Sequence, residues 1–385
     1  MRNKIEFKYR YGTCSKDCYG SCVFKGKWND NVSEKKFLTA IPLNDHPFTN
    51  GFLCSKLKKR EKFLYHPKRI RTALVRTGPK VNNSFISTNL EKVLTLIAEK
   101  LLYIKNKYGS SSIIAAYYAG NNGLVSKYAP FRFFGKLGAT VTSEGICNEA
   151  GCSALEELFG TYSTTNPLQI INPVNRLIIV WGCDLADKNS HAYFLVKKAI
   201  KKDSLVVVVN PIKTTLTDKA RLFLQPFPGT DHLIVKFILN KIMTSEKYDK
   251  DFLRRHVENY NYLFKEIKSV DDNEIISQTG LDRNILQDFV DLLIKYKHRT
   301  LFIVGFGIQK CFYGGKILNA IALIQIILGN FGKPGTGFLF SQSGFNKEFQ
   351  DPLIDYITLS KKYLLNKTIP LINLGSSLNS DKYKM

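Results

Sequence analysis

The chain has 385 residues, 44% of them hydrophobic, and its 56 Lys or Arg against 32 Asp or Glu residues give a formal net charge of +24. This length predicts two or three domains, and the hydrophobic content excludes an intrinsically disordered chain. The lysines are spread along the whole chain. We therefore interpret most of the charge as solvated faces and disfavour nucleic acid as a partner, because basic recognition surfaces usually cluster.

The apolar segments and the N-terminal residues indicate the cellular compartment of the protein. The longest apolar stretches, such as 205–209 and 317–328, are too short or too interrupted to cross a membrane. Residues 1–8 contain neither the apolar core of a signal peptide nor an Arg-Arg pair, which disfavours export. We expect a cytoplasmic protein with no membrane span, in which cysteines bind metal more readily than they form disulfides.

Four cysteines with metal-binding spacing lie in the first 75 residues. Cys14, Cys18 and Cys22 share one tight polar loop, and Cys54 follows after a stretch long enough to fold back over it. Four thiolates suit an iron–sulfur cluster or tetrahedral zinc. Zinc sites usually use two close pairs, whereas a triplet plus one distant cysteine is commoner around a cubane cluster, so we favour iron–sulfur.

Strand and helix patterns follow the cysteine-rich region. Residues 88–91 form a capping box, and apolar residues then recur at helical spacing until Gly109. Apolar strands alternate with helical patterns from there on, at 113–118, 177–181, 205–209 and 301–304. Repeated strand–helix units predict parallel sheets, and continuous apolar strands are typical of sheets covered on both faces.

Each of these strands ends in a glycine-bearing or polar turn. In parallel sheets, ligands bind beyond the carboxyl ends of the strands, where loops and helix N-termini present backbone N–H groups. The turn 305–307 lacks a third glycine at dinucleotide-binding spacing, and a helix cap accounts for 228–231. Local structure explains each turn singly, but the set together indicates a nucleotide-binding edge.

Seven segments, in this order along the chain, resemble the bis(molybdopterin guanine dinucleotide) oxidoreductases of molybdenum and tungsten, the superfamily of dimethyl sulfoxide reductase, formate dehydrogenase and periplasmic nitrate reductase. The resemblance runs from residue 11 to about residue 344. It rests on the four cysteines, Cys54-Ser55-Lys56, 145–151, 180–184, 209–214, 228–231 and 329–335. It implies a four-iron four-sulfur (4Fe-4S) cluster and two pterin guanine dinucleotides that bind Mo or W.

The resemblance also implies an α/β fold with a small β-rich iron–sulfur domain and two Rossmann-like parallel-sheet domains, one nested in the other. We place the iron–sulfur domain at 1–75, the first α/β domain at 76–165 plus 296–345, and the second at 166–295. Residues 346–385 are expected to be a tail, disordered or the start of further structure. Members of the superfamily continue into a C-terminal domain that covers both pterins, so a fragment or a subunit completed by another polypeptide is expected.

Site residues carry over from the same resemblance. Lys56 stands where the superfamily places a lysine between cluster and pterin, and Cys147 is our choice of metal ligand because a thiolate is a soft donor. Ser143 and Cys152 are its rivals, and Asn148 stands where formate dehydrogenases carry histidine, which disfavours formate as substrate. The expected cofactor contacts are Gly182, Cys183, Asp184, Asn210, Lys213, Gly229, Thr230, Asp231, Gly305 and Gly307.

The implied function is the two-electron oxidation or reduction of a small-molecule substrate at Mo or W, with single electrons passing through the cluster to an electron-transfer partner protein. Two alternatives stay open. One is a cluster-bearing electron-transfer subunit that has lost molybdenum. The other is a zinc-stabilised basic protein that binds nucleic acid.

Overall fold

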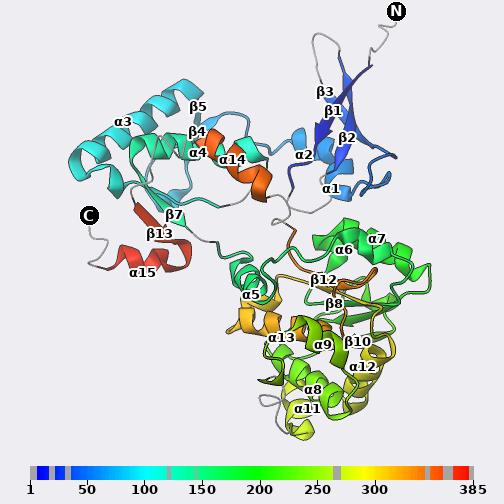
Figure 1. The fold of residues 1–385 in the computed structure, drawn as a ribbon. Helices are drawn as coiled ribbons and strands as arrows, with labels where there is room; N and C mark the ends of the chain where they lie inside the picture. The colour runs from blue at the N-terminus through cyan, green and yellow to red at the C-terminus, as the bar shows by residue number, and fades with distance from the viewer. Residues whose placement is uncertain are drawn as a thin grey trace, which may run out of the picture. The chain divides into compact units, whose positions relative to one another are not determined.

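The computed structural model describes residues 7–16, 22–30, 36–118, 123–143, 145–262, 270–342, 347–358 and 367–380. The chain forms two compact units: Met1–Ile146 with Lys347–Met385, and Cys147–Asn346 (Figure 1). The second unit is therefore an insertion within the sequence of the first. An antiparallel sheet at the N-terminus followed by parallel sheets confirms the predicted α/β class.

The first unit opens with a three-stranded antiparallel sheet and two short helices. These are β1 (Phe7–Thr13), β2 (Val23–Asn29), β3 (Lys36–Pro42), α1 (Ser55–Lys58) and α2 (Arg60–Leu64). One sheet face packs Trp28 and Phe37 edge to face, 5.3 Å between ring centroids, and contacts the buried Leu53 and Leu57. This small apolar cluster holds the sheet against the segment that carries Cys54.

The first unit also contains a hairpin, a parallel sheet and several helices. Their bounds are β4 (Ala73–Arg76), β5 (Phe85–Thr88), α3 (Leu90–Tyr108), β6 (Ile114–Ala115), α4 (Leu124–Leu137), β7 (Thr140–Ser143), α14 (Lys347–Thr358), β13 (Lys367–Pro370) and α15 (Leu374–Leu378), with short 3-10 helices at Lys80–Asn82, Ser110–Ser112 and Leu371–Asn373. The parallel sheet has the order β13-β7-β6. α3 begins where the sequence predicts a helix, but its N-cap is Asn89, which accepts a hydrogen bond from Glu91 N, and not the Thr88 of the expected capping box.

The predicted tail completes this unit. β13 pairs in parallel with β7, and its Ile369 side chain is only 1% exposed. Arg132 Nη2 on α4 donates to the carbonyl oxygen of Tyr356 on α14 at 3.2 Å. The described residues of 346–385 are therefore structured parts of the first unit, because the edge of β7 offers unpaired backbone groups that β13 satisfies.

The second unit is a five-stranded parallel sheet with helices. Its strands are β8 (Leu177–Trp181), β9 (Leu205–Val209), β10 (Leu222–Leu224), β11 (Thr300–Val304) and β12 (Gly337–Leu339). Its helices are α5 (Glu149–Phe159), α6 (Leu185–Lys188), α7 (Ser190–Ile200), α8 (Asp231–Thr244), α9 (Lys250–His256), α11 (Asp272–Thr279), α12 (Arg283–Lys295) and α13 (Gly314–Ile327), with 3-10 helices at Pro167–Ile171, Thr217–Lys219 and Ile308–Lys310.

The sheet of the second unit is buried on both faces. Leu177, Ile179 and Trp181 point to one face and share a core cluster with residues of α8, α12 and α13. Ile178 and Val180 point to the other face and are equally buried. This explains why these strands are continuous apolar runs rather than alternating ones.

The strand order is β10-β9-β8-β11-β12, so β8 comes first in the chain and its neighbours lie on opposite sides. Residues 296–345, predicted to belong to the first α/β domain, instead extend this sheet: β11 pairs with β8 from Thr300↔Leu177 to Val304↔Trp181. The reason is that β11 is buried along its whole length and needs a paired strand on both edges. The nested order is present, with the inserted unit at 147–346. No described helix combines the length and apolar character that crossing a membrane requires.

Candidate cofactor and metal sites

All five parallel strands of the second unit end at one edge of the sheet. The ten residues that we expected to contact the cofactor lie in the turns or at the helix starts that follow four of these strands: Gly182, Cys183 and Asp184 after β8, Asn210 and Lys213 after β9, Gly229, Thr230 and Asp231 after β10, and Gly305 and Gly307 after β11. The structure therefore brings distant residues to one edge of the sheet. Gly182 and Gly307, for example, are 125 positions apart in the sequence.

The tightest part of this edge lies between β8 and β11, where the strand order reverses. Gly182 has φ +62°, and a Cβ at Gly305 would lie 2.1 Å from the Gly182 carbonyl oxygen. The Gly305 N–H donates to Trp181 O at 2.8 Å. Only glycines permit this approach, and such a reversal point is where open α/β sheets bind their ligands.

Asp231 is the first residue of α8 and is tied to the sheet. Its Oδ1 accepts a hydrogen bond from Trp181 Nε1 at 2.7 Å. Burial raises the pKa of Asp231, and the bond from the indole acts in the opposite direction. Thr230 donates through Oγ1 to Phe227 O at 2.7 Å. These bonds hold the β10–α8 turn in place.

The other polar residues at this edge have local roles as well. Asp184 caps α6 by accepting from Ala186 N at 3.1 Å, and Asn210 accepts from Ile212 N at 3.1 Å. Burial, with the charge of Asp184, raises the pKa of Cys183 to about 11, so this thiol is neutral at pH 7. Lys213 is exposed. Turn formation explains Asp184 and Asn210 in part, whereas Lys213 is open to an anionic ligand.

Cys147 immediately precedes α5 and is held through its backbone. Gln309, which follows β11 and is 8% exposed, donates from Nε2 to Cys147 O at 2.6 Å. Its Oε1 accepts from Gly151 N, also at 2.6 Å. The side chain of Asn148 does not cap α5. Gln309 therefore accepts from a backbone N–H group in the first turn of α5, where such groups have no partner within the helix. The segment that carries Cys147 is thereby attached to the turn after β11.

The two rivals of Cys147 differ from it in their surroundings. Cys152 is buried in the core, accepts a hydrogen bond from Asn148 Nδ2 at 3.2 Å, and has its pKa raised to about 12, mainly by burial. Ser143 ends β7 in the first unit. Cys147 is only half-buried and is the better placed of the two thiols for ligation.

Gln342 lies just beyond β12 and was not expected from the sequence. Both its side-chain amide atoms are buried, and neither has a hydrogen-bond partner among the described residues. Buried amides normally have partners. A pterin or guanine ring presents donors and acceptors that suit an amide, so Gln342 and the open glycine turns fit a nucleotide-bearing pterin at this edge. Gln342 lies in no recognised motif, so nothing in the sequence indicates that it could contact a pterin or guanine ring.

In the first unit, three of the four predicted cluster ligands gather around one apolar cluster. Cys22 belongs to it, and Cys14 and Cys54 pack against it. Cys14 N donates to Cys22 O at 2.9 Å, which closes the β1–β2 loop. Cys18 lies outside the described residues. Within the part of the chain that is described, no three His, Cys, Asp or Glu side chains form a group able to hold a metal.

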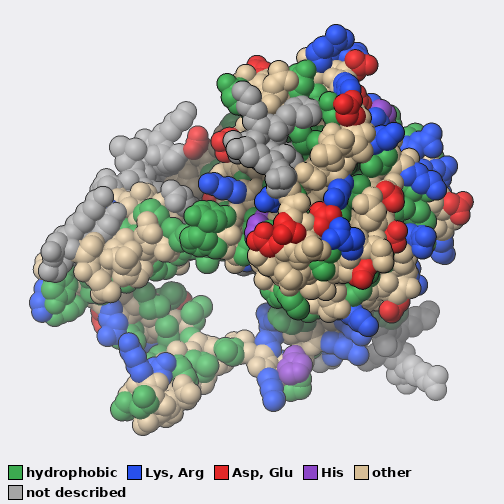
Figure 2. Space-filling view, turned by 90° about the horizontal axis from the view of Figure 1, so that it is seen from below, with side chains coloured by type: hydrophobic (Ala, Val, Ile, Leu, Met, Phe, Trp, Pro, Cys, Tyr) green, Lys and Arg blue, Asp and Glu red, His purple; other side chains and the backbone are tan. Residues whose placement is uncertain are grey.

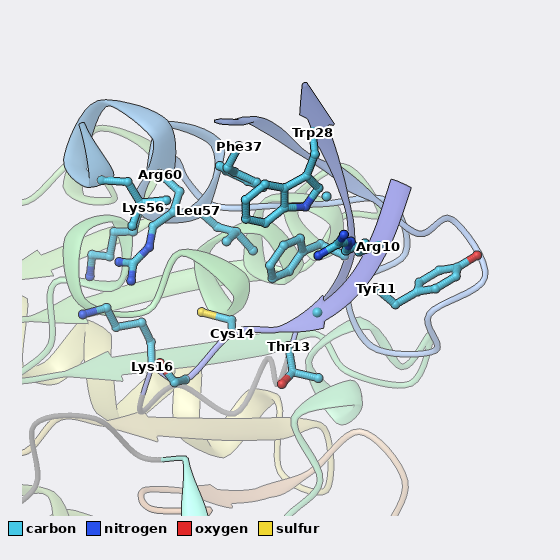
Figure 3. Close-up of a pocket in the computed structure, with 15 residues that line it drawn as sticks. Arg10, Tyr11, Thr13, Cys14, Lys16, Trp28, Phe37, Lys56, Leu57 and Arg60 are labelled. Atoms are coloured by element: carbon cyan, nitrogen blue, oxygen red, sulfur yellow. The ribbon is translucent and has the colours of Figure 1, made fainter. Parts of the chain in front are cut away.

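A cavity of about 340 Å³ opens beside Cys14 (Figure 3). Its wall is apolar where Trp28, Phe37 and Leu57 line it, and Cys14 brings its sulfur to the same space. Its basic lining residues are Arg10, Lys16, Lys56 and Arg60, and no acidic residue is among the described residues that line it. Cationic side chains suit a cluster whose thiolate ligands give it negative charge.

Elsewhere, basic side chains are dispersed. On the face that Figure 2 draws, Lys and Arg side chains are interspersed with acidic and apolar ones. This agrees with the interpretation of most of the charge as solvated surface.

Residues 69–367 match the molybdopterin oxidoreductase family. The chain belongs to this family. A probable oxidoreductase of Bacillus subtilis, YoaE, is 27% identical over 86% of this chain and 48% of its own length. The F420-dependent formate dehydrogenase subunit alpha of Methanocaldococcus jannaschii is 23% identical over 80% of the chain and 44% of its own. This chain thus spans about half the length of the relatives that it matches.

Among solved structures, acetylene hydratase from Pelobacter acetylenicus superposes with a TM-score of 0.61 at 18% identity, over 85% of this chain and 44% of that one. At this identity the likeness concerns the fold alone. It agrees with the predicted α/β architecture of the family.

Proposed function

We propose that this chain is a fragment or subunit of a molybdopterin-dependent oxidoreductase that binds bis(molybdopterin guanine dinucleotide) with Mo or W. The observation that supports this most is the convergence of the expected cofactor contacts on one carboxyl edge, with the Gly182–Gly305 approach at the point of strand reversal. When bound, the cofactor supplies two-electron chemistry on a small substrate, and the protein supplies binding, orientation and electrostatics.

The roles of the chain's own residues follow from their positions. The turns at Gly182, Gly229 and Gly305 let the backbone approach a pyrophosphate. The Asp231 carboxylate is the proposed acceptor for a guanine or ribose donor. Cys147 is the proposed thiolate ligand of the metal, held in place by Gln309.

For the iron–sulfur centre we propose Cys14, Cys18, Cys22 and Cys54 as ligands of a 4Fe-4S cluster. The packing of three of them on one apolar cluster and the basic cavity at Cys14 support this assignment. Lys56, two residues after Cys54, lines the same cavity. Its proposed role is electrostatic, to stabilise the reduced cluster and to assist electron passage towards the pterin.

The remaining features of the proposal concern partners and location. We propose an electron-transfer protein as partner, and a further polypeptide segment that supplies the parts of the relatives which this chain does not match. A reducing cytoplasm is the proposed compartment, because it keeps the cluster cysteines as thiols.

Anaerobic purification with metal and pterin analysis tests the proposal. We expect about four iron atoms and one Mo or W per chain, with guanine dinucleotide released on denaturation. Iron without Mo or W would favour the cluster-bearing electron-transfer subunit instead. Zinc without iron, together with salt-sensitive binding to DNA or RNA, would contradict both and support the nucleic-acid alternative.

A pair of cysteine variants tests the cluster ligands. Cys14→Ala removes a proposed ligand, so this variant should lack the cluster, its iron and its absorbance at about 400 nm. Cys311→Ala removes a thiol that donates to Ile308 O in the second unit and should keep both. Equal loss from the two variants would show general instability rather than loss of ligation.

A further inference from the structure

The outer face of the N-terminal sheet carries an aromatic stripe that no role above explains. Phe7, Tyr9 and Tyr11 alternate along β1 and are 42%, 48% and 72% exposed. Strand residues two apart point to the same face, so the three rings form one row. Three exposed aromatic rings in a row are unusual on a soluble surface and mark an interaction site.

Lysines of the neighbouring strand lie over these rings. In the β1–β2 register Tyr9 is opposite Lys27, and Tyr11 is opposite Lys25. Lys27 Nζ lies 3.9 Å from the centre of the Phe7 ring, and Lys25 Nζ lies 4.6 Å from that of Tyr9. The stripe is therefore flat, aromatic and positively charged, and these cation–π contacts hold its side chains in defined positions.

The charge of this sheet exceeds the average of the chain. Its three strands contain Lys8, Arg10, Lys25, Lys27 and Lys36, and no Asp or Glu. In the whole chain the ratio of basic to acidic residues is 56 to 32. Asp30, which follows β2, is paired with Lys8. Lys25 and Lys27 are opposite Tyr11 and Tyr9 and so share the face of the stripe, whereas Lys8 and Arg10 point to the opposite face. The two β2 lysines are therefore the cations that this face offers to an acidic surface.

The stripe leads directly to the proposed cluster site. Arg10 and Tyr11 line the cavity that holds Cys14. Cys14 is three positions along the chain from Tyr11, which is roughly 10 Å in an extended strand. A protein seated on the stripe would therefore bring its own redox centre near the cluster.

We propose that the outer face of β1–β2, formed by Phe7, Tyr9, Tyr11, Lys25 and Lys27, docks a small acidic electron-carrier protein. This inference rests on the proposed function, since it gives the cluster its exchange partner. One electron leaves the reduced centre of the carrier and enters the oxidised 4Fe-4S cluster, and no bond is made or broken. The lysines steer the acidic carrier to the face, and the aromatic rings supply apolar contact area.

The test is a charge reversal with a matched control in the full chain. Lys25→Glu with Lys27→Glu changes the net charge as much as Lys201→Glu with Lys202→Glu, two exposed lysines after α7. The probe is a reduced, acidic plant-type [2Fe–2S] ferredoxin, with binding measured by titration and cluster reduction by stopped flow at low and high salt. We expect the β2 pair to weaken binding and slow reduction about tenfold at low salt, and the control pair to change both less than twofold.

Equal losses from both pairs would overturn the proposal, because they would reflect net charge alone. The proposal would also be overturned if wild-type chain bound an oligothymidylate more tightly than ferredoxin and lost that binding in the β2 pair, since the face would then be a single-stranded nucleic-acid platform. Iron content and absorbance are recorded on the same samples. A chain without iron would sink the cluster assignment, while the binding titrations would still decide the docking face.

Discussion

Gln309 shows how much a single buried side chain contributes to the candidate site. It has no place in any motif, yet both of its amide atoms bond backbone groups on either side of the start of α5. Its partners lie 162 and 158 positions away in the sequence. No local pattern predicts such a bridge, because it depends on where the turn after β11 meets the start of α5. The choice of Cys147, in contrast, came from the resemblance of its segment to a known family segment, and it stays a prediction.

Gln309→Leu should therefore loosen the segment that carries Cys147. The substitution removes the acceptor for the buried Gly151 N–H and the donor to Cys147 O, and we expect a loss of roughly 2 to 4 kcal/mol in the free energy of unfolding. Gln309→Glu keeps the acceptor for Gly151 N and loses the donor to Cys147 O, so its loss should be smaller. Urea unfolding measures both, and the rate at which Cys147 is alkylated in cofactor-free protein should rise in both. Unchanged alkylation would contradict the positioning role.

At the scale of elements, α9 is joined to the start of β11 by a hydrogen bond between an Asp and a His side chain. Asp249 caps α9 by accepting from Phe252 N at 2.9 Å, and its Oδ2 lies 2.6 Å from Nε2 of His298. His298 N in turn donates to Asn330 Oδ1 at 2.6 Å. The helix start was not predicted here, but an Asp before a helical run is an ordinary cap. The partnership with His298, 49 residues away, is visible only in the fold.

This pair predicts a pH dependence of stability. Burial acts to raise the pKa of Asp249, but the hydrogen bonds from Phe252 N–H and His298 outweigh it, and the pKa is below its usual value. The folded state therefore favours the carboxylate, so this contribution is present above the pKa of the unfolded chain and is lost as the pH falls through the folded pKa. Asp249→Asn should flatten the decline in stability between about pH 5 and pH 3. Urea unfolding at several pH values measures this, and an unchanged slope would show that other carboxyl groups dominate.

At the scale of the whole molecule, the first unit is assembled from both ends of the chain. Its parallel sheet takes β6 and β7 from before the inserted unit and β13 from after it. The predicted nesting was therefore of the right kind, and its boundaries were wrong. Apolar periodicity identifies β11 as a strand but does not say which sheet it joins, since all buried parallel strands share the same pattern.

Ile369 tests this closure of the chain. Its side chain is 1% exposed in β13, whereas Ile372, three residues later, is 74% exposed. Ile369→Ala should reduce the free energy of unfolding of the first unit by roughly 2 to 5 kcal/mol, and Ile372→Ala by less than about 0.5. Thermal and urea unfolding measure both variants. Equal effects would show that β13 does not stabilise the unit.

The sequence by itself determined the α/β class, the buried strands β8, β9 and β11, and the family, because each rests on short-range periodicity or on local segments. Tertiary structure alone decided that β11 joins β8, that β13 closes the first unit, and that Gln309 and Gln342 lie at the candidate site. These depend on pairings between distant segments, where many strands could satisfy the same backbone hydrogen bonds. Only the packing of side chains across the whole unit selects one of them.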